Sequence, residues 1–194
     1  MKMHFLLAWL LLVASATSAM AAGPYIGAAT GITVYHDSDL STGGTGKIEY
    51  EPGGAAKASL GYNFDGFRLE GEFGYKRADV DSFQTVTVPE GSMDTTIFSY
   101  MINAYWDIKT GRIVTPFIGA GIGKLHAKMT DPYAAYRDDV LGYQISVGTA
   151  IKITNKLNID VTYCYQAAAE DFFIGVYDVS YASSNLLAGV RYNF

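Results

Sequence analysis

Charged side chains lie between apolar or small neighbours in several stretches of this 194-residue chain. The residues that show this pattern are Lys57, Arg68, Glu70, Glu72, Asp160 and Arg191. A β-strand points alternate side chains to opposite faces. The pattern therefore places these charges on one face of a sheet and the apolar residues on the other. Opposite charges on such a face can form ion pairs, and a row of them can also gate ions or carry protons.

Ion pairing is the chemistry we favour, because unpaired charges in a narrow interior are costly. Asp160 and Arg191 lie at similar heights on the last two predicted strands, counted from the end of the barrel that carries the short turns, and we predict a salt bridge. Glu72 with Lys57 is the second predicted pair. Further charges on the same face are Lys76, Lys152 and Asp107.

Catalytic, cofactor-binding and metal sites are not predicted. His36 falls in a loop, and no His-x-Ser spacing with a third orienting group accompanies it or His126. Cys164, the only cysteine, is expected to pack inside the fold, and it excludes an internal disulfide framework. The sequence therefore gives no indication of an enzyme.

Charged residues form 17% of the chain, against about 25% in a typical soluble domain. The formal net charge is −5, and nucleic-acid binding calls for a basic patch instead. The chain is long enough for one domain with a sizeable core.

The N-terminus has the features of a secretory signal peptide. Lys2 precedes the apolar run 5–13, and Ala19-Met20-Ala21 fits the small-x-small cleavage pattern. The apolar run is too short to cross about 30 Å of bilayer as a helix. We therefore predict that residues 1–21 are a cleaved signal and that residues 22–194 form the mature domain.

Period-2 alternation dominates the mature chain and predicts eight strands. They are Pro24–Tyr35, Ala55–Phe64, Phe67–Ala78, Thr95–Asp107, Pro116–Ala127, Val140–Ile153, Leu157–Ala168 and Ser183–Phe194. Short connections, such as Asp65-Gly66, alternate with long ones at 36–54, 79–94, 128–139 and 169–182. An even strand number with alternating connection lengths is typical of an up-and-down barrel.

The bulk of the two faces separates a membrane barrel from a soluble one. The interior of an eight-stranded barrel is just wide enough for side chains. Tyr, Phe and Leu from eight strands would overfill it, whereas Gly, Ser and Asn fit. The bulky face must point outward into lipid, so we predict an all-β, eight-stranded antiparallel up-and-down transmembrane β-barrel.

Aromatic residues gather near the predicted strand ends, as girdles at the two membrane interfaces do. The girdle beside the short turns includes Phe64, Phe67, Trp106 and Phe117, and the girdle toward the long loops includes Tyr35, Tyr75, Tyr100, Tyr143 and Tyr165. Lys124 and His126 fall on the outward face of their strand. Either a bulge near Gly123 reverses the register, or these residues lie above the lipid.

Three segments carry a resemblance to a known family: Gly23-Pro24-Tyr25-Ile26-Gly27, residues 116–123 (PFIGAGIG) and residues 189–194 (GVRYNF). The chain resembles the small outer membrane β-barrel superfamily of Gram-negative bacteria, which includes the outer membrane protein A transmembrane domain and opacity-type surface antigens. The resemblance implies localisation in the outer membrane after export to the periplasm. It also implies that Tyr192 and the terminal Phe194 form the signal read by the barrel-assembly machinery.

The four long connections contain fourteen acidic residues against three basic ones. The acidic residues are Asp37, Asp39, Glu49, Glu51, Asp79, Asp81, Glu90, Asp94, Asp131, Asp138, Asp139, Glu170, Asp171 and Asp178, and the basic residues are Lys47, Lys128 and Arg137. A hydrated outer surface explains this balance. Divalent cations that bridge the carboxylates to lipopolysaccharide phosphates are a second interpretation.

We therefore expect a structural surface protein with outer membrane lipids and lipopolysaccharide as its surroundings. An adhesin or surface antigen that binds a host-surface ligand through its loops is the leading interpretation. A narrow porin-like channel is the alternative, and a lipid A-modifying enzyme is a third.

Overall fold

A computed structural model describes residues 22–36, 38–40, 46–50, 52–83, 86–87, 94–110, 113–130, 135–174 and 177–194. The predicted signal peptide at residues 1–21 lies outside the described residues and stays a prediction. Within the described residues, no helix is long and apolar enough to cross a membrane.

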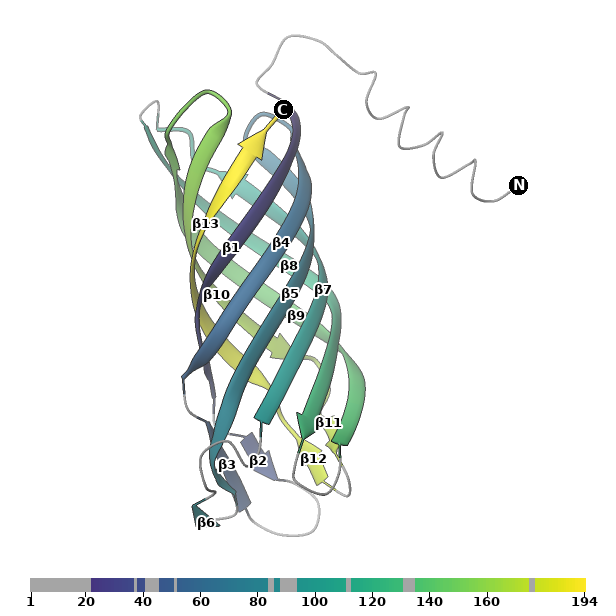
Figure 1. Cartoon of the computed structure of the whole chain (residues 1–194). Helices are drawn as coiled ribbons and strands as arrows, with labels where there is room; N and C mark the ends of the chain where they lie inside the picture. Colours follow the sequence, from purple (N-terminus) through teal and green to yellow (C-terminus); the bar gives the residue numbers. More distant parts are fainter. Residues whose placement is uncertain are drawn as a thin grey trace, which may run out of the picture.

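Eight long strands form the closed antiparallel barrel that the sequence predicts (Figure 1). They are β1 (Gly23–Tyr35), β4 (Gly53–Asn63), β5 (Phe67–Phe83), β7 (Asp94–Asp107), β8 (Val114–Thr130), β9 (Ala135–Lys152), β10 (Leu157–Ala168) and β13 (Ala182–Asn193). Each strand pairs with its two neighbours along the chain, and β1 closes the ring against β13.

Five short strands lie at the end of the barrel opposite the C-terminus (Figure 1). They are β2 (Ser38–Leu40), β3 (Gly46–Tyr50), β6 (Val86–Thr87), β11 (Phe172–Ile174) and β12 (Tyr177–Val179). β12 pairs with β2, β2 with β3, and β3 and β6 with the far end of β5. We call these five strands and the end of β5 the outer extension. The sequence did not predict them, because the polar residues of the long connections hide their pairing.

Several strand boundaries also differ from the prediction, and the two largest differences are in β5 and β9. β5 continues past Ala78 to Phe83, and β9 begins at Ala135 instead of Val140. The added residues are mostly polar and lie beyond the apolar part of the wall. They keep the strand ladder in water, where alternation of apolar and polar residues is no longer required.

The turn at Asp65-Gly66 confirms the predicted two-residue hairpin. The Phe64 amide donates to the Phe67 carbonyl at 2.6 Å. Asp65 and Gly66 both have positive φ, at 60° and 108°, as a type I′ turn requires. The Asn63 side-chain oxygen accepts from the Gly66 amide at 3.0 Å, which stabilises the turn further.

The two faces of the wall have the predicted orientation. Ile102, Trp106 and Ile122 are 65–70% exposed on the outside, whereas Arg68 and Asn103 are buried in the lumen. An outward apolar wall around a polar interior reverses the arrangement of a soluble barrel. The wall is therefore built for lipid.

A small residue is required inside where the wall strands approach closely. A Cβ added to Gly31 on β1 would lie 1.9 Å from the Leu186 carbonyl oxygen, whereas a Cβ added to Gly54 on β4 would meet no atom within 4 Å. We expect the Gly31→Ala substitution to lower the free energy of unfolding by about 1–3 kcal/mol, because the Leu186 backbone must move.

Urea unfolding in detergent micelles, followed by tryptophan fluorescence, measures this effect. Gly54→Ala is the matched control and should leave the unfolding midpoint unchanged. Equal effects of the two substitutions would contradict the close approach of β1 and β13.

Candidate functional site

The lumen is the first candidate site, because its charged side chains lie inside the wall. Arg68 at the short-turn end is 2% exposed, and its guanidinium pairs with the Asp107 carboxylate at 2.9–3.0 Å. The same guanidinium lies over the rings of Tyr105 and Phe117, at 4.6 Å and 5.0 Å from their centroids. Arg68 is thus held by one carboxylate and two aromatic faces.

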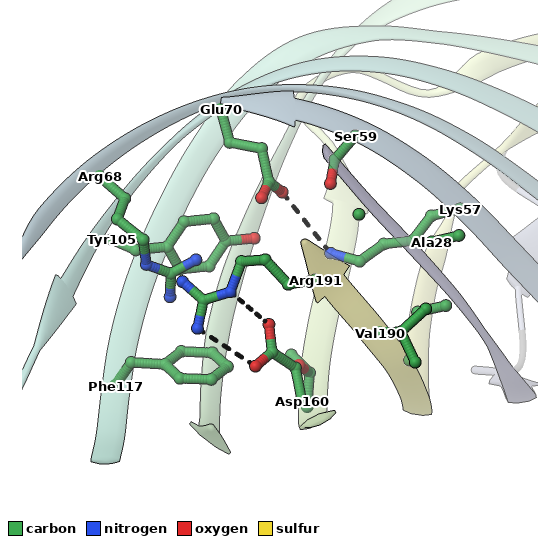
Figure 2. Close-up of a pocket in the computed structure, with 14 residues that line it drawn as sticks. Ala28, Lys57, Ser59, Arg68, Glu70, Tyr105, Phe117, Asp160, Val190 and Arg191 are labelled. Carbon is green, nitrogen blue, oxygen red and sulfur yellow. Dashed lines mark hydrogen bonds and ion pairs between the residues drawn. The ribbon is translucent and has the colours of Figure 1, made fainter. Parts of the chain in front are cut away.

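Asp160 and Arg191 meet as the sequence predicts. Arg191 Nε lies 3.0 Å from Asp160 Oδ2, and a terminal guanidinium nitrogen donates to Oδ1 at 3.2 Å. Figure 2 shows this two-point contact between β10 and β13. The two residues are offset by two positions along the paired strands, since Asp160 lies opposite Gly189. Both side chains lean along the wall to bridge that offset.

Lys57 connects two carboxylates. Its ammonium donates to Glu72 at 2.8 Å and lies 3.8 Å from Glu70 (Figure 2 shows the Glu70 contact). The Tyr25 hydroxyl donates to the other Glu70 oxygen at 2.9 Å. The pair of Lys57 with Glu72 that the sequence predicts is therefore present, and Glu70 shares the same cation.

Lys76 stands apart because its ammonium contacts neutral oxygens. It donates to Gln166 Oε1 at 2.7 Å and, at longer range, to Tyr181 and Ser183. Gln166 donates to Gln144 at 2.9 Å, and Gln144 donates to Glu72 at 3.2 Å. Two amides therefore link the positive Lys76 to the negative Glu72, which lets their dipoles align with both charges.

The inward charges described in the lumen balance. Four cations, Lys57, Arg68, Lys76 and Arg191, face four carboxylates, Glu70, Glu72, Asp107 and Asp160. The expected fifth cation, Lys152, is exposed at the end of β9, where the strand leaves the lumen. Lys152 is therefore not an interior residue, contrary to the sequence-based assignment.

An apolar cluster closes the lumen toward the outer extension. Its buried members are Tyr35, Ala78, Ile97, Met101, Leu125, Ala127, Val140, Phe172, Val179 and Tyr181. Phe172 and Val179 come from the connection after β10, so this connection folds back over the mouth of the barrel. We call this set the mouth cluster. Tyr35 belongs to it and not to a lipid-facing girdle as expected, because its side chain turns inward at 3% exposure.

The girdle beside the short turns is partly as expected. Phe64, Phe67 and Trp106 are 43–67% exposed on the outer wall. Phe117 is 2% exposed and packs in the lumen against Tyr105, with ring centroids 5.7 Å apart. The girdle assignment of Phe117 is wrong, because this residue shares the inward face of β8 with three glycines that leave room for large side chains.

The terminal aromatic residues, Tyr192 and Phe194, lie on the outside of the barrel. Their rings meet edge to face with centroids 5.4 Å apart. The Phe194 amide donates to the Pro24 carbonyl at 3.1 Å, which joins the chain end to β1. These positions leave both rings open to a partner during insertion, and their role as an assembly signal stays a prediction.

Two histidine contacts on the outer wall were not found by sequence reasoning. His36 Nε2 lies 3.0 Å from Ser184 Oγ, which also bonds to the Tyr163 hydroxyl at 2.9 Å. His126 Nδ1 contacts Asp139, whose other oxygen lies 2.7 Å from Lys124 Nζ. The strand pairs β1–β13 and β8–β9 create both contacts, and no local motif could have indicated them.

Neither histidine has the third group that nucleophilic catalysis requires. In the described part of the chain, no carboxylate bonds to the His36 ring, and no hydroxyl bonds to the His126 ring. No group of three or more His, Cys, Asp or Glu side chains is arranged for a metal ion among the residues that the structure describes.

The cavity between the charged pairs is small. It has a volume of about 30 Å³ and lies between Lys57, Arg68, Glu70, Asp160 and Arg191 (Figure 2). This volume holds about one or two water molecules. Charged pairs with a cavity of this size can fill and rigidify a barrel, but they cannot hold an organic solute.

The chain is similar in sequence to known outer membrane proteins. A family model described as outer membrane protein beta-barrel domain matches residues 5–194. Outer membrane protein PagN of Salmonella typhimurium is 24% identical over 174 residues, which cover 70% of this chain and 71% of PagN.

Solved structures show the same fold. Neisserial surface protein A has a TM-score of 0.62 at 22% identity, covering 89% of this chain and 99% of its own. Ail of Yersinia pestis, in complex with the heparin analogue sucrose octasulfate, has a TM-score of 0.50 at 16% identity, covering 88% of this chain and 99% of Ail. Identities this low support the fold alone.

The pair of Arg68 with Asp107 allows a test of the filled lumen. We expect Arg68→Met to lower the free energy of unfolding by about 3–5 kcal/mol, since it leaves the Asp107 carboxylate buried without its cation. The double variant Arg68→Met/Asp107→Leu should recover most of this loss, because it removes both charges.

The measurement is urea unfolding of the refolded protein in micelles, analysed as a double-mutant cycle. The variants Lys109→Met and Lys109→Met/Asp65→Asn are the control, because Lys109 and Asp65 pair in a more exposed position at 2.7 Å and Asn tolerates the positive φ of residue 65. A loss from Arg68→Met as small as that from Lys109→Met would contradict a buried, paired lumen.

Proposed function

Because the chain belongs to the outer membrane protein beta-barrel domain family, we propose that it is a closed surface barrel that binds a partner through its outer extension. The protein resides in the outer membrane, with its long connections outside, as the up-and-down barrels of this membrane have. The observation that carries the proposal is the filled and capped lumen. A barrel that passes no solute has its accessible chemistry on its outside.

Two successive layers support the closed state. The ion pairs and amides fill the lower and middle lumen, and the mouth cluster covers them with buried apolar side chains such as Leu125 and Phe172. An ion would have to break paired charges and then cross an apolar constriction, which disfavours conduction. The narrow porin-like channel is therefore the weaker candidate.

The outer extension offers a built surface for a partner. Pairing of β2 with β12 and β3 joins the first and last long connections through backbone hydrogen bonds. Asp138 Oδ2 also accepts from the Phe173 amide at 2.7 Å, so the last connection is attached to β9. These contacts give the extension a defined shape, which favours specific binding over a purely steric coat.

Charge indicates the kind of partner. With fourteen acidic and three basic residues in the long connections, the surface complements a cationic partner, such as a basic patch on a host protein. Ail was solved with a heparin analogue, but a sulfated polyanion would be repelled by the acidic extension of this chain. An adhesin or surface antigen with a cationic protein ligand fits these charges best.

Binding, rather than catalysis, is the activity that we propose. The His36–Ser184 contact would need an orienting carboxylate to act on a lipid ester. Lipid A mass spectra of cells with and without the protein should be identical, and a new acyl pattern would favour the lipid A-modifying enzyme.

A closed lumen should not conduct ions. Refolded protein in a planar lipid bilayer should give no stable openings at moderate voltage, because the mouth cluster and ion pairs close the lumen. A variant with Ile97→Ala, Leu125→Ala and Phe172→Ala removes three apolar side chains from the mouth cluster and should conduct more often. Stable openings of the unmodified protein would overturn the closed-barrel proposal.

Binding through the outer extension can be tested by removing two of its strands. Cells whose barrel carries a Gly-Ser linker in place of residues 170–180 should lose binding to host cells, because the linker removes β11 and β12. Binding of the unmodified protein should weaken with added salt, as expected for an acidic surface with a cationic partner.

Insertion of the same linker at Thr154-Asn155, in a short turn at the opposite end, is the matched control and should leave adhesion unchanged. Both variants should retain the heat-dependent shift in gel mobility that reports a folded barrel. Unchanged adhesion of the 170–180 variant, or inhibition by heparin instead of by a soluble polycation, would contradict the proposal.

A further inference from the structure

Two short turns form a groove at the end of the barrel that carries the C-terminus (Figure 1). They join β4 to β5 and β7 to β8, and they are neighbours because β5 pairs with β7. The groove has a volume of about 420 Å³ and is lined by residues 64–67 and 106–109. Phe64, Phe67 and Trp106 in this lining are exposed on the outer wall, so the groove opens toward the membrane and not toward the lumen. We call it the turn groove.

Backbone contacts hold the turn groove in shape. The Asp107 amide donates to the Gly66 carbonyl at 2.7 Å, which joins the second turn to the first. The Thr110 hydroxyl donates to the Val114 carbonyl at 2.6 Å and braces the second turn. The groove is therefore formed before any ligand arrives, and a ligand that enters it need not order the chain.

A carboxylate and an ammonium lie together at the rim of the turn groove. Lys109 Nζ lies 2.7 Å from Asp65 Oδ2, and the two side chains are 60% and 28% exposed. An ammonium has three donors and a carboxylate has about four acceptor positions. The pair thus keeps donors and an acceptor for a ligand, and its own net charge is zero.

Aromatic rings form the apolar part of the turn groove. Phe67 lies opposite Trp106 in the strand register, and the Phe64 and Phe67 ring centroids are 6.3 Å apart. Such rings are favoured at the level of the lipid headgroups. They can also attract a cation to their faces. The groove therefore lies where lipid headgroups lie, on the periplasmic side to which the short turns of these barrels belong.

The turn between β9 and β10 provides a contrast at the same end of the barrel. Its Lys156 lies over the Tyr192 ring at 5.8 Å, and no carboxylate in the described part of the chain pairs with it. A cation beside a ring is enough to attract an anionic headgroup. The added carboxylate of Asp65 in the turn groove instead fits a ligand that carries a positive group beside its phosphate.

We propose that the turn groove binds a zwitterionic phospholipid of the periplasmic leaflet, of the phosphatidylethanolamine class. Lys109 holds the lipid phosphate, and Asp65 accepts a hydrogen bond from the primary ammonium of the headgroup. The three rings cover the glycerol end of the acyl chains. The inference does not rest on the adhesin proposal, because adhesion uses the outer extension at the opposite end of the barrel.

Two related lipids match the groove less well. Phosphatidylglycerol has the phosphate but no positive group, so it places a negative charge beside Asp65 without compensation. Phosphatidylcholine has a positive group that cannot donate a hydrogen bond to the Asp65 carboxylate. The order of affinity expected from these contacts has phosphatidylethanolamine first.

Quenching of Trp106 fluorescence tests this order, because Trp106 is the only tryptophan in residues 22–194. The refolded protein, residues 22–194, is placed in phosphatidylcholine nanodiscs that contain increasing fractions of brominated phosphatidylethanolamine or brominated phosphatidylglycerol. Bromine quenches the ring only when the lipid lies beside it. Phosphatidylethanolamine should bind about fivefold more tightly than phosphatidylcholine, as expected for one charged contact at a membrane surface.

Two substitutions at the rim should change the affinities differently. Lys109→Gln should weaken binding of phosphatidylethanolamine about fivefold, because the phosphate loses its cation. Asp65→Asn, in which Asn tolerates the positive φ, should remove the preference for phosphatidylethanolamine and strengthen binding of phosphatidylglycerol. Both variants should keep the heat-dependent gel shift, so a change in lipid selectivity is distinguished from a loss of fold.

The matched control is Lys156→Gln, which removes a cation from the neighbouring turn and should leave quenching by brominated phosphatidylethanolamine unchanged. Equal affinities of the two brominated lipids for the unmodified protein, or an unchanged selectivity in Asp65→Asn, would overturn the assignment. Equal losses in Lys156→Gln and Lys109→Gln would also overturn it. Soluble phosphoethanolamine at the same concentration should not compete, and competition by it would contradict a membrane lipid as the occupant.

Discussion

Hydrocarbon offers no hydrogen-bond partner to a peptide group, and closure of β1 against β13 meets this constraint for the whole wall. Eleven residue pairs, from Tyr25 opposite Asn193 to Tyr35 opposite Ser183, join the two ends of the sheet. Once the ring is closed, each strand has one face toward lipid and one toward a narrow lumen. The alternation in the sequence, the outward aromatic residues and the inward charges all follow from that closure.

A polar lumen is stable only if its charges are paired, and the paired side chains also fill the lumen. The four cations and four carboxylates described in the lumen pair directly or through Gln144 and Gln166, and Arg68 also lies against two rings. Such contacts hold the strands in one register as effectively as they block a pore. The mouth cluster adds an apolar layer above them, so the function of this barrel has to be sought on its outer surfaces.

The sequence predicts which face of the wall a side chain takes and which residues lie at similar distances from the short-turn edge of the barrel. The salt bridge of Asp160 with Arg191 could be predicted in this way, although the long connection 169–181 joins β10 to β13. The pair of Lys57 with Glu72 could be predicted because the turn at Asp65-Gly66 joins β4 to β5. The pair of Arg68 with Asp107 was not predicted, because it depends on the register of β5 against β7, in which Asp107 lies two positions beyond Tyr105, the residue opposite Arg68. Phe117 was assigned by its position near a turn, although its parity with three glycines of β8 indicates the lumen. Phe172 enters the mouth cluster from a long connection, where no periodic signal exists.

The net charge of −5 is the sum over three regions of the protein that differ in charge. The lumen charges that the structure describes cancel, the long connections are strongly acidic, and Lys124 and Lys128 on β8 and Arg137 on β9 lie on the wall near the outer extension. An acidic extension next to an anionic leaflet would be repelled at distances below the Debye length of about 8 Å. Cations on the wall beside the extension reduce this repulsion, because they lie within that distance of both negative surfaces.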